Sequence, residues 1–302
     1  MLCFYHGQDN DGRLAAFWIR KLCEAEGTYF EPSDFVPMDY GTAFPLDSVS
    51  RGESVYIVDF SVEPDVMEAL LRNDVRVVWI DHHASAIRKL EGYEDVPGFR
   101  IEGVAACELA YCWVKGARSE MDVGETLLPE SSVPYFTRLV GDFDIWNFEY
   151  GDDTRDFQYG TVMEDTGPLG GLWDDLLAEE EAHLPSRTLA EVLRKGADAR
   201  EYRMAWADEY LGKFAFTSVL EGIPCYCVNL GPPTADLFDD AKREGGICAS
   251  FAWDGGKRSV SLYGDGSVDV SRIAEKFGGG GHPGAAGFSC DELPFAKGEA
   301  PA

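Results

Sequence analysis

The sequence predicts an α/β protein with a parallel-sheet N-terminal domain and flanking helices, a helical linker, and a smaller mixed-sheet α/β C-terminal domain. Three observations predict this class. Short apolar runs alternate with helical patterns, a long charged helical stretch follows, and strand-like runs between glycine-rich turns come last. Strands that alternate with helices are typical of a parallel sheet flanked by helices. We therefore expect domains at 1–185 and 213–302 and a linker at 186–212.

Short apolar runs in the N-terminal half are the expected strands of the parallel sheet. They cover residues 1–6, 54–61 and 75–83. Helical patterns alternate with them or follow them, at residues 12–26, 63–73, 103–116 and 133–146. The first pattern repeats apolar residues at the spacing of one helix face, at Leu14, Phe17, Trp18 and Leu22. The last helix is expected to end near Gly141.

The C-terminal part follows a charged helical stretch over 184–211, the expected connector. Its strand-like runs are residues 226–231, 247–255 and 258–266. A short helix is expected over 268–277, because Asp269 is a suitable N-cap residue and Gly278 stands just past the end. The run Gly278–Gly281 and His282 come next.

Charge and composition narrow the function. With 26 basic and 54 acidic residues, the formal net charge is −28. Such a surface repels polyanions, which argues against non-specific binding of a long duplex. A small anionic substrate is compatible with this charge if metal ions or a basic pocket reverse the local electrostatic field. The acidity is also compatible with a salty environment.

The sequence predicts a cytoplasmic protein without a membrane partner. No run approaches the ~18 consecutive apolar residues of a membrane span, and no basic segment precedes the first apolar residues as in a signal peptide. None of the eight cysteines forms a CxxC motif, so we expect reduced thiols. A homodimer is compatible with the sequence.

Potential metal ligands follow each expected strand of the first domain. His6 is followed by Asp9 and Asp11, a single Asp59 follows the second strand, and the third ends in Asp81, His82 and His83. Asp142 stands at a fourth junction, where a helix meets a loop. The carboxyl ends of parallel strands meet at one crevice, so these side chains are expected to converge there.

The mixture of carboxylates and imidazoles predicts divalent metal ions. Carboxylates this close cannot all stay ionised without cations. Aspartate and histidine together favour Mn²⁺, Mg²⁺ or Fe²⁺ over thiolate-binding ions. Two ions about 3.5–4 Å apart, sharing a carboxylate, suit attack on a phosphoryl group. Each motif alone also fits an ordinary turn or N-cap; their order at strand ends favours one shared site with two ions, Mn²⁺ preferred.

The motifs resemble those of the DHH phosphoesterase superfamily, named for an Asp-His-His motif. The similar segments are HGQDNDG, IVDFS, IDHHAS and GDFDIW, and VDVSRIAEKFGGGGHPGAAGF resembles the signature of the DHH-associated C-terminal domain. Relatives include RecJ-type exonucleases, nano-RNases, cyclic-dinucleotide phosphodiesterases, manganese pyrophosphatases and exopolyphosphatases. The likeness spans nearly the whole chain.

The resemblance implies two metal sites bridged by Asp59. One ion would be held by His6, Asp9 and Asp59, and the other by Asp11, Asp59, His82 and Asp142. Many relatives place the first histidine four residues before the first aspartate, whereas His6 and Asp9 are three apart. Either the loop is tighter here or His6 is not a direct ligand.

The resemblance also implies catalytic and substrate-binding residues. Asp81 would orient His82, and His83 would donate to the scissile phosphate. His282 and the backbone of Gly279, Gly280 and Gly281 would hold the substrate, and Arg272 would add positive charge near them.

The expected activity is a metal-dependent phosphodiesterase or exonuclease acting by two-metal water attack. The acidic surface favours short oligonucleotides or linear and cyclic dinucleotides over long nucleic acid, which needs a basic track. The alternatives are an exopolyphosphatase or pyrophosphatase, and a catalytically silent nucleotide sensor.

Overall fold

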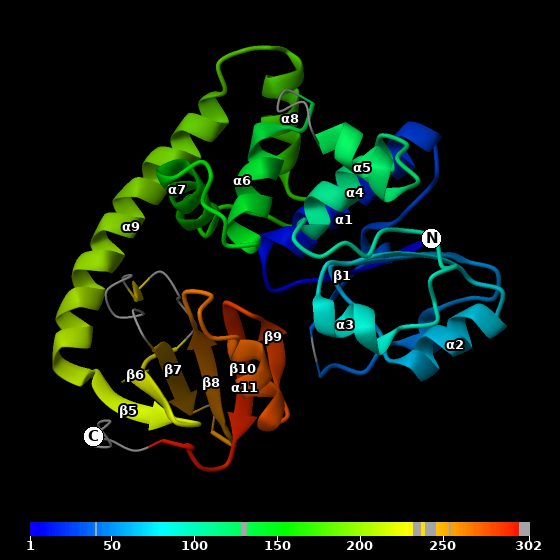
Figure 1. Cartoon of the computed structure of the whole chain (residues 1–302). Coiled ribbons are helices and arrows are strands. Elements are labelled where there is room, and N and C mark those ends of the chain that lie inside the picture. Colours follow the sequence, from blue (N-terminus) through cyan, green and yellow to red (C-terminus); the bar gives the residue numbers. More distant parts are fainter. Residues whose placement is uncertain (40, 128–131, 232–236, 239–245, 254, 296–302) are drawn as a thin grey trace. The chain divides into compact units, whose positions relative to one another are not determined.

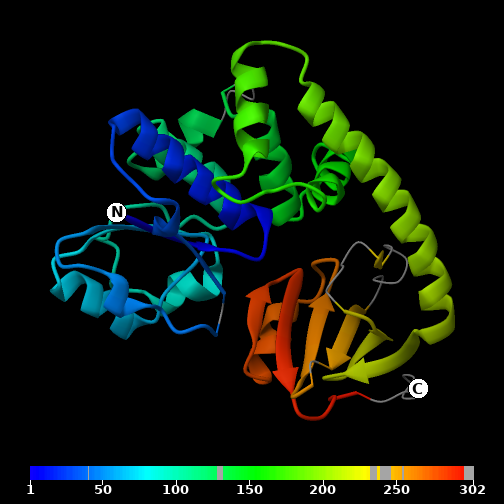
Figure 2. The same cartoon turned by 180° about the vertical axis from the view of Figure 1, so that it is seen from behind.

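The computed structural model describes residues 1–39, 41–127, 132–231, 237–238, 246–253 and 255–295. The chain divides into two compact units, Met1–Arg200 and Glu201–Ala302. The first holds a four-stranded parallel sheet and the second a six-stranded mixed sheet, which confirms the predicted fold class (Figure 1). The division falls inside one long helix, α9 (Arg187–Phe214), drawn in yellow-green in Figure 2. The predicted limits at 185 and 213 stay predictions.

The parallel sheet of the first unit has the strand order β2-β1-β3-β4. These strands are β2 (Phe35–Met38), β1 (Leu2–His6), β3 (Ser54–Val58) and β4 (Arg76–Ile80). In β1, Cys3 and Tyr5 join one hydrophobic core, whereas Leu2 and Phe4 join another. Since side chains alternate across a strand, β1 is buried on both faces, and this explains its unbroken apolar sequence.

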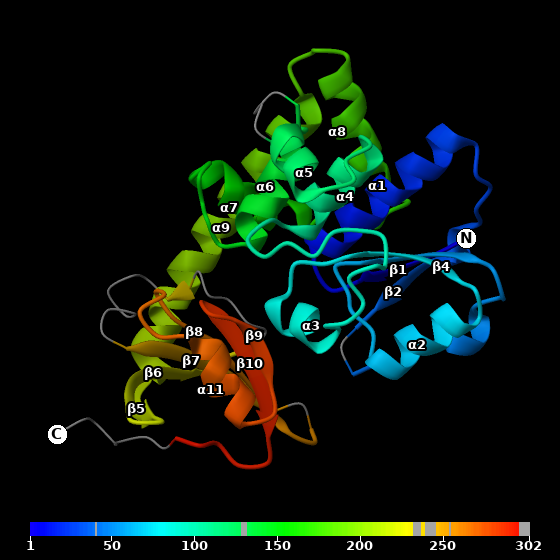
Figure 3. The same ribbon diagram turned by 45° about the vertical axis from the view of Figure 1, so that its right-hand side comes forward.

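Helices cover both faces of this sheet, as Figures 1 and 3 show. The larger core includes residues of α1 (Asn10–Glu26), α4 (Ala106–Val114), α5 (Glu120–Leu127), α6 (Tyr135–Asp144), α7 (Asp152–Thr161) and α8 (Gly171–Glu181). The smaller core takes Met67 and Leu70 from α2 (Pro64–Arg72). The short helices α3 (Ala84–Lys89), η1 (Pro32–Asp34) and η2 (Leu46–Ser48) complete the unit.

Local sequence signals fix α1 against the end of β1. Asp9 caps the helix, since its Oδ1 accepts a hydrogen bond of 3.0 Å from the Gly12 backbone N–H. Gly27 ends it in the left-handed conformation, with φ 69°. A Cβ atom at Gly12 would stand 2.2 Å from the His6 carbonyl oxygen, so only glycine permits this approach. The close contact brings the first turn of α1 to the strand end.

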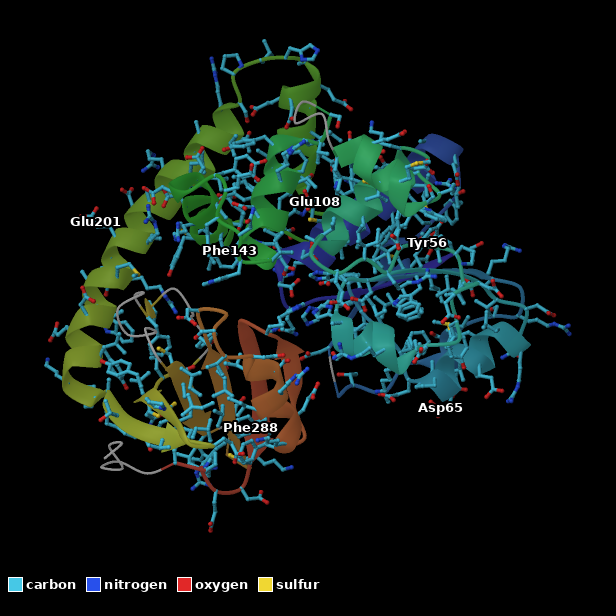
Figure 4. All side chains as sticks on the ribbon, in the orientation of Figure 1. Tyr56, Asp65, Glu108, Phe143, Glu201 and Phe288 are labelled. Carbon is cyan, nitrogen blue, oxygen red and sulfur yellow. The ribbon has the colours of Figure 1, made fainter. Side chains whose placement is uncertain are left out.

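The second unit is a mixed sheet with the strand order β5-β6-β7-β8-β10-β9. The strands are β5 (Phe216–Leu220), β6 (Ile223–Asn229), β7 (Ile247–Trp253), β8 (Arg258–Tyr263), β9 (Gly280–His282) and β10 (Ala285–Cys290). Helix α11 (Val270–Lys276) begins after Asp269, whose Oδ1 accepts from the Ser271 N–H, so its predicted N-cap is confirmed. Phe288 of β10, labelled in Figure 4, joins the core of this unit.

Two features differ from the sequence-based expectation. Helix α6 does not end near Gly141 but continues to Asp144. A Cβ atom at Gly141 would lie 2.8 Å from Glu108 Oε2 of α4, so this glycine permits close helix packing rather than ending the helix. The edge strand β9, Gly280–His282, was also not expected from the sequence. Among the described helices, none combines the length and apolar character that a membrane span requires.

Candidate metal centre

The candidate site lies at the point where the order of strands in the parallel sheet reverses. The chain passes from β1 to β2 on one side and then to β3 on the other side of β1. Such a switch point opens a crevice at the carboxyl ends of the strands. His6 ends β1, Asp59 directly follows β3, and Asp81 directly follows β4. The topology therefore explains why residues distant in sequence converge.

Asp59 is at the centre of this convergence. Its Oδ2 lies 3.6 Å from Nδ1 of His6, and its Oδ1 lies 3.4 Å from Nε2 of His82 and 3.7 Å from Nδ1 of His83. The side chain is 1 % exposed, and its backbone is in the left-handed region with φ 51°. A non-glycine residue in this region is uncommon and points to a functional constraint. Oδ2 of Asp59 thus faces His6, and Oδ1 faces His82 and His83.

Three sets of potential ligands share Asp59, one of them with Asp81 and His83. The donor atoms of His6, Asp9 and Asp59 lie within 4.8 Å of one another, and so do those of Asp11, Asp59 and His82. His6 Nδ1 is 2.7 Å from Asp9 Oδ2, so the spacing of three residues brings His6 into the cluster. The sets with Asp9 and with Asp11 are the two groupings that the resemblance implies, apart from Asp142.

Asp11 is held rigidly in the second set. Its two oxygens accept hydrogen bonds from the backbone N–H groups of Ala106 (2.9 Å) and Cys107 (2.8 Å), in the first turn of α4. Its Oδ2 lies 3.6 Å from Nε2 of His82. The positive end of a helix stabilises a carboxylate, so α4 holds Asp11 beside His82.

Asp81 contacts the ring of His83 rather than that of His82. Its Oδ1 lies 2.8 Å from His83 Nδ1 and accepts the backbone N–H groups of His82 and His83. The Ser61 hydroxyl donates to Oδ2 of Asp81, and the Trp79 indole N–H donates to Ser61 at 3.1 Å. Nε2 of His82 faces Asp59 and Asp11, while Asp81 also accepts the backbone N–H of His82. That Asp81 orients the His82 ring stays a prediction.

Asp144, rather than the Asp142 that the resemblance implies, lies beside His82 in this cluster. Asp142 accepts the backbone N–H groups of Glu149 (2.8 Å) and Tyr150 (3.3 Å) and the Thr154 hydroxyl. Asp144 Oδ2 instead lies 3.2 Å from Nε2 of His82.

Helical geometry explains why Asp144 and not Asp142 lies beside His82. Residues two apart point about 200° away from each other on a helix, so only one of the pair faces the strand ends. The sequence analysis missed Asp144. The motif GDFDIW contains Asp144 as its second acid, and this was the available signal. Helical spacing alone could not decide which of the two aspartates faces the strand ends.

Charges in the cluster strongly shift its pKa values. Burial lowers the pKa of both His6 and His82, but nearby aspartates outweigh it and raise these pKa values to about 10 and about 11. Burial also lowers the pKa of His83, which Asp81 and Asp59 raise to about 9. Burial raises the pKa of Asp144 to about 7. Burial raises the pKa of Asp59 too, but the adjacent imidazoles hold it well below its usual range.

The donor set fits divalent metal ions. Neither buried oxygen of Asp59 accepts a hydrogen bond of ordinary geometry from the described residues. A buried charge without such donors is costly unless a cation pairs with it. Without metal, imidazolium protons supply this positive charge, as the raised histidine pKa values show. Mixed Asp and His donors suit Mn²⁺, Mg²⁺ or Fe²⁺, and the geometry does not choose among them.

The predicted substrate-binding residues of the second unit lie on two elements. Gly280, Gly281 and His282 form the edge strand β9, where Gly281 has φ 140° and a Cβ atom would stand 2.6 Å from Ala286 Cα. Gly279 precedes this strand. Arg272 is 82 % exposed on α11 and pairs with Asp269 at 3.4 Å. The substrate-binding roles of these residues stay predictions.

Comparison with solved structures identifies the fold. The chain has the fold of a DHH domain. No family model matches the sequence, and no curated protein matches it. Among solved structures, it is similar to the DHH domain of a protein described as a member of a ribosomal protein family, with 14 % identity, a TM-score of 0.56, and coverage of 96 % of this chain and 82 % of that one.

A second solved structure is an exopolyphosphatase-related protein from Bacteroides fragilis. It is 13 % identical with a TM-score of 0.52, and the match covers 97 % of this chain and 87 % of that one. At identities this low, the structural likeness shows the fold and does not identify a substrate.

Proposed function

We propose that the protein is a divalent-metal-dependent phosphodiesterase that hydrolyses short oligonucleotides or linear and cyclic dinucleotides. The observation that carries this proposal is Asp59, shared by the set with Asp9 and the set with Asp11 and turning one oxygen to each. A shared carboxylate between two ions is the arrangement that suits displacement at phosphorus. We assign His6, Asp9 and Asp59 to one ion, and Asp11, Asp59, His82 and Asp144 to the other.

We assign different roles to the metal ligands and to His83. When bound, the ions would lower the pKa of water and offset negative charge on the phosphoryl group. His83 is the donor that we assign to a phosphoryl oxygen. Its side chain is 22 % exposed, unlike the buried His82, and Asp81 holds its Nδ1. A fixed donor aimed at developing charge favours the transition state over the ground state.

The charge of the protein supports a short substrate. A net charge of −28 repels a long polyanion, whose binding depends on many basic contacts. A dinucleotide or short oligonucleotide has few phosphates, and bound metal ions would neutralise the one that reacts. Inorganic polyphosphate or pyrophosphate is the second candidate, favoured by the likeness to the exopolyphosphatase-related structure.

One experiment separates these substrates. The purified protein is incubated with Mn²⁺ and a dinucleotide, a five-nucleotide RNA, a cyclic dinucleotide, 3′-phosphoadenosine 5′-phosphate and polyphosphate, and the products are identified. Hydrolysis of the first two or three supports the proposal. Turnover of polyphosphate alone establishes the second candidate, and binding without turnover of any compound establishes a nucleotide sensor. A matched Asp59→Asn sample shows which turnover belongs to this site.

A further inference from the structure

Three aromatic side chains near Asp144 in the chain form a compact cluster. The Phe143 and Trp146 ring centroids are 5.3 Å apart, those of Trp146 and Phe148 are 4.6 Å apart, and those of Phe143 and Phe148 are 6.0 Å apart. All three side chains are partly exposed. Figure 4 labels Phe143 at the end of α6. We call these three residues the aromatic cluster.

The hydrophobic core does not explain the aromatic cluster. Ile145 and Tyr150, on the same segment, pack against the larger core. Phe143, Trp146 and Phe148 are not among the described residues that build or cover any of the three cores. The Arg155 guanidinium lies over the Phe148 ring, 4.0 Å from its centroid. Large aromatic side chains that leave the core can offer their remaining ring surface to a ligand.

The backbone of this segment is held in an unusual conformation. Trp146 and Phe148 are both in the left-handed region, with φ 60° and φ 57°. Bulky residues rarely adopt it, and such outliers cluster at functional sites. Asp142 stabilises the segment, because its carboxylate accepts the N–H groups of Glu149 and Tyr150 and its carbonyl accepts the N–H of Asn147. The rings of Trp146 and Phe148 are therefore held on a braced loop, and Phe143 lies near the end of α6.

In the chain the aromatic cluster flanks Asp144, a residue of the candidate metal centre. Phe143 directly precedes Asp144, whose Oδ2 is 3.2 Å from His82, and consecutive Cα atoms are about 3.8 Å apart. We propose that the aromatic cluster is a stacking platform for the nucleobase joined to the scissile phosphate. The inference rests on the proposed function and narrows it to substrates that carry a base. Base–aromatic stacking tolerates any base, so the platform would not select sequence.

The test compares two substrates that differ only in the bases. Trp146→Leu and Phe148→Leu remove a ring face while keeping a large side chain on the same backbone. We expect each variant to raise KM for a dinucleotide about tenfold, the value of one stacked base, and to leave KM for the abasic dinucleotide unchanged. Trp146→Phe keeps a ring and should restore most of the affinity. Tyr29→Leu removes another exposed aromatic ring, which is 76 % exposed, and is the matched control.

A second measurement works without turnover. Equilibrium dialysis in the presence of a chelator compares the binding of adenosine 5′-monophosphate with that of ribose 5-phosphate. We expect the leucine variants to lose only the additional affinity that the base gives to adenosine 5′-monophosphate. Equal losses on the compounds with and without a base, or no loss on either, would overturn the stacking platform. If the wild-type protein cleaves neither dinucleotide, the phosphodiesterase proposal fails, while the dialysis still decides the platform. Thermal melts identify any variant that does not fold.

Discussion

Oδ2 of Asp144 lies 3.2 Å from Nε2 of His82, although the two residues belong to a helix and to the loop after a strand. The same imidazole nitrogen is 3.4 Å from Asp59 and 3.6 Å from Asp11. Three carboxylates therefore surround one nitrogen of His82. This crowding is the physical basis for placing a cation there and for assigning Asp144, rather than Asp142, to the metal centre.

The two neighbouring aspartates should behave differently when altered. Asp144→Asn should abolish one metal site and lower activity more than about 100-fold, beyond the usual effect of a residue that only supports a ligand. Asp142→Asn should lose about 2 kcal/mol of stability, because its carboxylate accepts three hydrogen bonds. Elemental analysis and thermal melts measure both. Loss of metal in the Asp142 variant with full occupancy in the Asp144 variant would reverse the assignment.

Asp59→Ala should be the most damaging single ligand change. It removes the carboxylate that both ligand sets share, so both ions should be lost together. Asp65→Ala, which alters an exposed carboxylate in the first turn of α2, is the control and should keep both ions. Metal content is measured by elemental analysis after loading with Mn²⁺. Two ions retained in the Asp59 variant would show that it does not bridge.

His83→Ala should lower kcat by about 10²–10³-fold while both ions stay bound. A donor to a reacting phosphoryl oxygen gains strength as charge develops, and one such donor has about this value. Steady-state kinetics on a dinucleotide, together with metal analysis, measure the effect. An unchanged kcat would exclude His83 from transition-state stabilisation, and lost metal would make it a ligand instead.

Ser61→Ala should indirectly weaken the contribution of His83 to catalysis. Ser61 links the Trp79 indole to Asp81, and Asp81 holds Nδ1 of His83. Without the hydroxyl, one oxygen of Asp81 loses its donor, so we expect kcat to fall about 10-fold with KM and metal content unchanged. Ser48→Ala, at the exposed end of η2, is the control. In a His83→Ala background the Ser61 change should have no further effect, and an additive loss would contradict the link.

Metal affinity should fall as the pH is lowered. In the metal-free protein the pKa values of His6 and His82 are raised to about 10 and about 11, so both rings are protonated near neutral pH. Metal binds the neutral imidazole and must displace these protons. From about pH 8 to about pH 6, the Mn²⁺ affinity should drop about tenfold per pH unit for each proton released. Calorimetry in buffers of different ionisation enthalpy counts the protons, and a pH-independent affinity would refute the displacement.

Much of the site was visible in the sequence because it depends on strand ends. Apolar runs end at His6, Asp59 and Asp81, and a parallel sheet places such ends at one edge. His82 was recognisable for the same reason. Strand β2 was not predicted, although its place beside β1 creates the switch point. Its sequence, FVPM, is short and contains a proline, so local propensity gave no signal.

The sequence by itself determined the fold class, the positions of most strands and helices, and most of the candidate ligands. These follow from periodicity and chain order, which are local properties. Only the tertiary structure decided that Asp144 faces His82, that Asp81 holds His83, and that Gly141 lies inside α6 against Glu108. Each of these depends on the rotation of one element against another. That rotation is set by packing between residues far apart in the chain, which no local pattern contains.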